Sequence, residues 1–143
     1  MDPVQGITVH ALLVCRKAEA AASGELTLHD VLEILAVDSL PGEAGPVTFV
    51  ALVRNLPEGP GKGAFVVRAP APQSVDLARC PLEVQVPKGY AGRQVALQVR
   101  LPSLPVARGG WYELHFEWAG QVLAANRFAV GARSVAAPAP PAR

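Results

Sequence analysis

The sequence predicts an all-β protein, an antiparallel β-sandwich of about seven to nine short strands. Fourteen prolines and thirteen glycines interrupt short apolar runs, and turn signals recur after roughly every ten residues. Residues 93–101, RQVALQVRL, have the clearest strand pattern because apolar and polar side chains alternate along them. We expect Val95, Leu97, Val99 and Leu101 to face the core, and Gln94, Gln98 and Arg100 to face outward.

The other strands follow from further apolar runs that lie between turn residues. We expect them over residues 7–16, 47–54, 64–68 and 82–86, with a final hairpin over residues 111–130. Residues 40–42 and 87–89 supply turns, and residues 55–63, NLPEGPGKG, predict a turn-rich loop.

Residues 25–37, ELTLHDVLEILAV, fit two different structures. Thr27 followed by Asp30 has the spacing of a capping box, which would begin a short helix. The apolar residues equally suit two short strands that meet at a kink around His29 and Asp30. Periodicity does not separate the two in so short a run.

The final hairpin places two kinds of side chain on opposite faces, because strand residues alternate. Tyr112, Leu114, Phe116 and Trp118 form a core stripe, whereas Trp111, Glu113, His115 and Glu117 form a solvated row. Ala119 and Gly120 supply the tight turn. Leu123 and Phe128 are an odd number of residues apart, so both face inward only if the return strand changes phase. We therefore predict a bulge near Ala125 and Asn126.

Length and composition predict one domain over residues 1–131 and a disordered Ala/Pro-rich tail over residues 132–143. The chain has 143 residues, of which 50% are hydrophobic and 17% charged, so it has enough apolar surface for a core of its own. Its net charge is only +1. We therefore expect neither nucleic acid nor a membrane among its partners.

The protein is predicted to be cytoplasmic. Its first residues lack a basic segment, and the apolar run at residues 7–15 is followed by basic residues, the reverse of a signal peptide. No apolar stretch approaches the roughly 18 residues of a membrane-spanning helix. Cys15 and Cys80 are accordingly predicted to be reduced thiols, with Cys15 buried on a strand.

Both ends of the chain resemble an uncharacterised bacterial immunoglobulin-like β-sandwich family, a domain of unknown function. The N-terminal stretch HALLVCRKAEAAASGELTLHDVLEIL carries the first part of the resemblance, at Ala11, Leu12, Leu13, Cys15, Gly24, Leu26, Leu28, Val31 and Ile34. The second part comprises Tyr112, Leu114, Phe116, Gly120, Val122, Phe128 and Val130.

This resemblance implies an immunoglobulin-like fold and favours two strands over a helix for residues 25–37. Asp30 stands where the family favours glycine, and aspartate tolerates the left-handed backbone that such a kink requires. The resemblance implies no known activity, so no functional residue is carried over.

No catalytic, cofactor-binding or metal site is predicted. Side chains two apart on a strand are about 6.5–7 Å apart, so Glu113, His115 and Glu117 do not all reach one zinc ion. The serines lie in no GxSxG motif, and residues 59–63, GPGKG, lack the GK[ST] ending of a phosphate-binding loop. We therefore expect no enzyme and no cofactor.

The sequence favours a non-catalytic interaction or structural module. With so few charges to protect its sheet edges, the chain is expected to bind a protein partner or a second copy of itself, through a sheet edge or an outer face. Trp111, Glu113, His115 and Glu117 are the candidate partner surface. The alternative is a small-ligand-binding sandwich, for a carbohydrate-like ligand, with Trp111 as a stacking platform.

Overall fold

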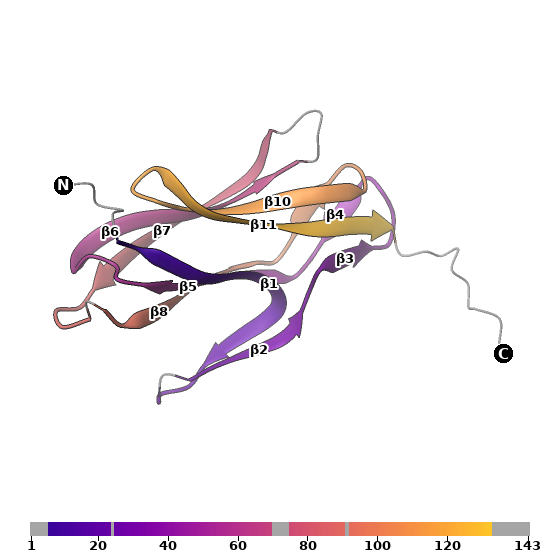
Figure 1. Ribbon diagram of the computed structural model, residues 1–143. Helices are drawn as coiled ribbons and strands as arrows, with labels where there is room; N and C mark the ends of the chain where they lie inside the picture. Colours follow the sequence, from indigo (N-terminus) through magenta and orange to yellow (C-terminus); the bar gives the residue numbers. More distant parts are fainter. Residues whose placement is uncertain (1–5, 24, 70–74, 91, 133–143) are drawn as a thin grey trace.

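The structure, a computed structural model, describes residues 6–23, 25–69, 75–90 and 92–132, which form eleven strands and no helix (Figure 1). One sheet has the strand order β2-β1-β5-β8, from Leu26–Val31, Thr8–Ala20, Val47–Arg54 and Gln94–Leu101. A second has the order β3-β11-β10-β6-β7, from Ile34–Val37, Gln121–Ala132, Gly110–Trp118, Gly59–Arg68 and Asp76–Val86. The short strands β4 (Gly42–Ala44) and β9 (Leu104–Val106) pair with each other.

The hydrophobic core lies between the four-stranded and the five-stranded sheet. Phe49 of β5 contacts Phe65 of β6 on the opposite sheet, with ring centroids 6.0 Å apart. Phe65 in turn lies 5.5 Å from Phe116 of the neighbouring β10. All three rings are fully buried, so this aromatic chain joins the two sheets through their centres.

The predicted all-β class is confirmed, but the prediction of short, purely antiparallel strands is wrong. Strands β1, β7 and β11 have 13, 11 and 12 residues. Strand β3 runs parallel to β11, so the five-stranded sheet is mixed. A parallel edge of this kind arises from pairing between segments far apart in the chain, which local sequence patterns do not report.

Residues 25–37 form two strands, as the resemblance implied, and not a helix. Strand β2 pairs with β1 in one sheet, and β3 pairs with β11 in the other. Asp30 lies near the crossing point with a φ of 55°, in the left-handed region. The segment therefore passes from one sheet to the other along the same edge of the molecule (Figure 1).

The predicted loop at residues 55–63 is partly wrong, because β6 begins at Gly59. Gly61 and Gly63 belong to the strand, where the indole of Trp118 covers them. A Cβ atom on Gly63 would lie 2.8 Å from Cε3 of that ring, closer than packing allows. The glycines that indicate a loop in the sequence instead make room for a core tryptophan.

The final hairpin contains the expected bulge at a different position. Phe116 pairs with Ala124 and Glu117 with Val122, so Leu123 is the extra residue, two positions before the predicted site. The amide of Asn126 donates a 2.8 Å hydrogen bond to the carbonyl of Leu12 in β1. Asn126 therefore forms a contact between the two sheets and is not the site of the bulge.

Both cysteines are free, Cys15 fully buried and Cys80 partly buried. Burial raises the pKa of both thiols, and a hydrogen bond from Cys15 to the Lys17 carbonyl only partly offsets this for Cys15. None of the described residues belongs to a helix that could cross a membrane. The predicted tail begins at Ala132, the last residue of β11, and its residues 133–143 lie outside the described residues.

We predict that Gly61→Ala destabilises the protein by about 1–3 kcal/mol, because the added methyl would overlap the Trp118 ring and force it to shift. Gly131→Ala is the matched control, since a Cβ atom there meets nothing within 4 Å. Urea unfolding curves of the two variants measure the difference. Equal stability of both variants would contradict the packing of Trp118 over β6.

We predict that Cys15 resists a thiol-specific reagent in the native protein and that Cys80 reacts more slowly than a free thiol. A raised pKa leaves less thiolate at neutral pH, so the Cys80 rate should increase as the pH approaches that pKa from below. The Cys80→Ser variant should react only after unfolding. Rapid labelling of that variant in native buffer would show that Cys15 is not buried.

Candidate functional site

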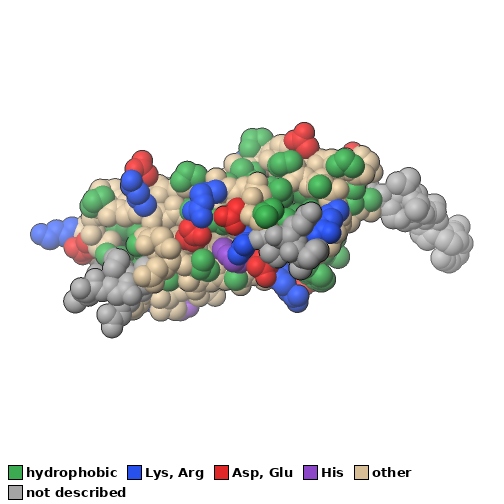
Figure 2. Space-filling view, turned by 90° about the horizontal axis from the view of Figure 1, so that it is seen from above, with side chains coloured by type: hydrophobic (Ala, Val, Ile, Leu, Met, Phe, Trp, Pro, Cys, Tyr) green, Lys and Arg blue, Asp and Glu red, His purple; other side chains and the backbone are tan. Residues whose placement is uncertain are grey.

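The candidate surface is the outer face of the five-stranded sheet. Four residues of β10 belong to this face. The core stripe is confirmed, because Tyr112, Leu114, Phe116 and Trp118 are at most 3% exposed. The residues that alternate with them therefore lie on the other face of the strand, namely Trp111, Glu113, His115 and Glu117. Figure 2 looks onto this face.

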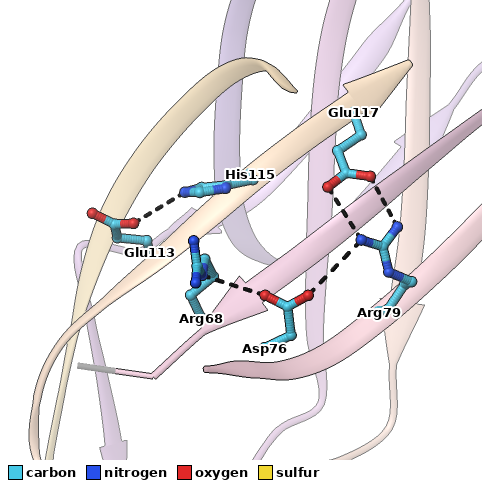
Figure 3. A network of polar contacts seen from close by, with 6 residues as sticks. All are labelled: Arg68, Asp76, Arg79, Glu113, His115 and Glu117. Carbon is cyan, nitrogen blue, oxygen red and sulfur yellow. Dashed lines mark hydrogen bonds and ion pairs between the residues drawn. The ribbon is translucent and has the colours of Figure 1, made fainter. Parts of the chain in front are cut away.

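An ion-pair network joins three strands across the middle of this face (Figure 3). Arg79 of β7 donates two hydrogen bonds to the Glu117 carboxylate, at 2.9 and 3.2 Å. Arg79 also lies 3.9 Å from Asp76, which pairs with Arg68 of β6 at 3.3 Å. The Glu117 carboxylate raises the pKa of Arg79, because the pair stabilises the charged guanidinium.

His115 and Glu113 form a second pair on β10, with His115 Nε2 and Glu113 Oε1 3.0 Å apart (Figure 3). The side chains of His115 and Glu117 are only 15% and 16% exposed, whereas that of Glu113 is 51% exposed. Both carboxylates thus already have partners within the protein. Among the residues that the structure describes, no group of three or more His, Cys, Asp and Glu side chains could hold a metal ion.

Trp111 lies at the end of the row, away from this network. It pairs with Ala129 of β11, and Ala129 pairs on its other side with Ile34 of β3. Trp111 is 52% exposed and Ile34 62% exposed. The guanidinium of Arg127 lies 4.9 Å from the Trp111 ring centroid, a cation–π contact. We call Trp111, Ile34, Arg127 and Ala129 together the Trp111 site.

The sequence indicated Trp111 but not the other three residues of the site. Ile34 comes from the segment whose structure was ambiguous, and its parallel pairing with β11 joins residues far apart in the chain. The sequence also gave no indication of Arg68, Asp76 and Arg79, for a similar reason. The pairing of β6 with β7 and with β10 brings these charges to Glu117, and no local motif announces that pairing.

Comparison with known proteins does not assign this chain to a family. No protein-family model matches the chain, and no curated protein is significantly similar to it. The chain is similar to part of a solved structure, that of Pseudomonas fluorescens alkylpurine DNA glycosylase AlkC bound to DNA containing an abasic site analog. Sequence identity is 9% and the TM-score is 0.48, and the match covers 87% of this chain but 30% of that one. So distant a likeness carries no argument about what this protein does.

Two exclusions drawn from the sequence stand opposite this finding. We expected the protein not to be an enzyme and to have no nucleic-acid partner, yet the similar protein is a glycosylase bound to DNA. Neither exclusion followed from the residues, because a net charge summed over a chain does not describe the local field on one face. A fold likewise does not fix a function. Both exclusions are therefore withdrawn, and the likeness assigns neither an activity nor a nucleic-acid partner to this chain in their place.

We predict that Glu117→Gln lowers the free energy of unfolding by about 0.5–1 kcal/mol at low salt, through loss of the charged pair with Arg79. The difference in unfolding free energy between the variant and the native protein should be smaller in high salt, because salt screens the Glu117–Arg79 pair of the native protein. Glu83→Gln on β7, the strand of Arg79, is the control, because Glu83 is exposed and forms no ion pair with any described residue. Denaturant unfolding at two salt concentrations measures both, and a salt-independent loss would contradict the electrostatic origin.

Proposed function

We propose that this protein is an immunoglobulin-like β-sandwich that acts as an interaction module, and that a partner polypeptide docks on the Trp111 site. The carrying observation is the exposure of Trp111 and Ile34 on either side of Ala129, in one row across three strands.

Two features support the immunoglobulin-like assignment. Strands β1, β5 and β8 lie in one sheet and β11, β10, β6 and β7 in the other. Among these seven strands the chain changes sheet after β5, β7 and β8, in addition to the passages through β3 described above. This Greek-key order is typical of immunoglobulin-like sandwiches. Near the start of β10, the Tyr112 hydroxyl donates a 2.6 Å hydrogen bond to the carbonyl of Arg108. A tyrosine bonded to the backbone a few residues upstream is the tyrosine corner of such folds.

The Trp111 site differs from the rest of its face. In the middle of the sheet, the carboxylates and guanidinium groups engage one another, and Figure 2 shows charged side chains and a histidine gathered there. At the Trp111 site the exposed side chains are mainly apolar. Tryptophan is over-represented among the residues that dominate binding energy, and burying an exposed Trp and Ile removes much apolar surface from water.

The surroundings of Trp111 specify the chemistry of the partner. Its apolar side chains would cover Trp111 and Ile34, and a carboxylate would pair with Arg127, whose guanidinium already lies over the indole. The same guanidinium lies over a face of the ring that a sugar would need for stacking. The geometry therefore favours a polypeptide partner over the carbohydrate-like ligand.

We predict that Trp111→Ala weakens partner binding at least tenfold, because truncating a central aromatic contact removes about 2 kcal/mol or more. The experiment identifies proteins retained from a lysate of the source organism by the immobilised full chain, then measures the affinity of the purified partner by calorimetry. Val122→Ala is the matched control, since Val122 is equally exposed, at 52%, on the same hairpin beside its turn.

Two results together support the proposal. One partner binds the full chain and the Val122→Ala variant with equal affinity, and the same partner binds the Trp111→Ala and Ile34→Ala variants more weakly. Circular dichroism confirms that each variant is folded, which the exposure of all three side chains leads us to expect. Retention of the partner by all variants, or absence of any partner for the full chain, would refute docking at this site.

A further inference from the structure

A depression of about 420 Å³ lies on the four-stranded sheet, the sheet opposite the Trp111 site. Its lining includes Arg16 and Lys17 of β1, Thr48 of β5, and Gln98 and Arg100 of β8. The volume falls within the roughly 300–1,000 Å³ range of small-molecule sites. We call it the basic depression.

Three cationic residues line this depression, and the three strands that line it carry one carboxylate between them. Glu19 is the single carboxylate in the sequence of β1, β5 and β8. It is already engaged, by His29 at 2.7 Å and Lys17 at 3.4 Å, and these partners lower its pKa. The depression therefore carries a local positive charge that the chain's net charge of +1 conceals.

The donors are held in different ways. Arg16 donates a 3.3 Å hydrogen bond to the carbonyl of Pro46, the residue before β5, and both residues line the depression. The nearly buried Thr48 hydroxyl donates to the carbonyl of Arg16 at 3.4 Å and so ties β5 to this part of β1. Arg100 is the direct neighbour of Thr48 in the ladder, and its side chain has no hydrogen bond or ion pair with the described residues. Its forked donors remain available to a ligand.

We propose that the basic depression binds the phosphate group of a larger phosphorylated ligand. The unengaged Arg100 guanidinium matches an anion with several acceptor oxygens, because Arg pairs with phosphate in bidentate geometry. Arg16 and Lys17, although bound to the Pro46 carbonyl and to Glu19, add positive charge beside it. The Gln98 amide adds a neutral donor beside them. The volume exceeds that of a phosphate alone, so the remainder of the ligand would lie in the same hollow.

The test titrates the full chain with inorganic pyrophosphate, and separately with a ten-nucleotide oligothymidylate, by calorimetry at low salt. Arg100→Gln should weaken binding about tenfold or more, because a charge-assisted hydrogen bond is lost. It should leave the fold intact, since the Arg100 side chain is exposed and has no partner among the described residues. Lys88→Gln is the charge-matched control, in the turn before β8 and outside the depression.

Tighter binding of pyrophosphate than of oligothymidylate would assign the site to free phosphorylated molecules. Tighter binding of the oligonucleotide, with affinity that falls steeply as salt rises, would assign it to a nucleic-acid backbone. Both results support a phosphate site provided that Arg100→Gln is weakened and Lys88→Gln is not. Failure of both probes to bind, or equal weakening by both substitutions, would overturn the proposal. Trp111→Ala should not affect this binding, so this test and the docking test fail independently.

Discussion

Strand β10 carries the constraint on which both the core and the candidate site depend, namely the alternation of its side chains between two faces. Tyr112, Leu114, Phe116 and Trp118 are buried because they meet the opposite sheet. The same geometry sends Trp111, Glu113, His115 and Glu117 outward. A shift by one residue would expose four large hydrophobic side chains and bury two glutamates and a histidine, so the register of β10 is strongly determined.

The partners of β10 adapt to its large side chains. Phe116 contacts Phe65, which reaches Phe49 across the core, and Trp118 lies over Gly61 and Gly63. Two glycines within a strand weaken it locally, because they add backbone entropy and no side-chain contact. Here the indole occupies that missing space, so β6 and β10 pair closely up to the end of the hairpin.

The two outer faces then offer different chemistry. On the five-stranded sheet the charged groups largely bind one another, and the exposed apolar pair of the Trp111 site stands apart from them. On the four-stranded sheet the cations of the basic depression outnumber the nearby carboxylates. The two outer faces therefore present different chemistry to the solvent.

The sequence by itself determined the all-β class, the inward and outward sets on β10, the existence of a bulge and the burial of Cys15. These properties depend on alternation and on local turn chemistry, which act over a few residues. Only the tertiary structure decided that β3 runs parallel to β11, that Gly61 belongs to a strand, and that Ile34 and Arg127 join Trp111. It also decided that Arg79 neutralises Glu117 and that Arg16 and Arg100 share one hollow. Such contacts join residues separated by tens of positions, and pairing between distant strands is set by the packing of the whole core rather than by any local pattern.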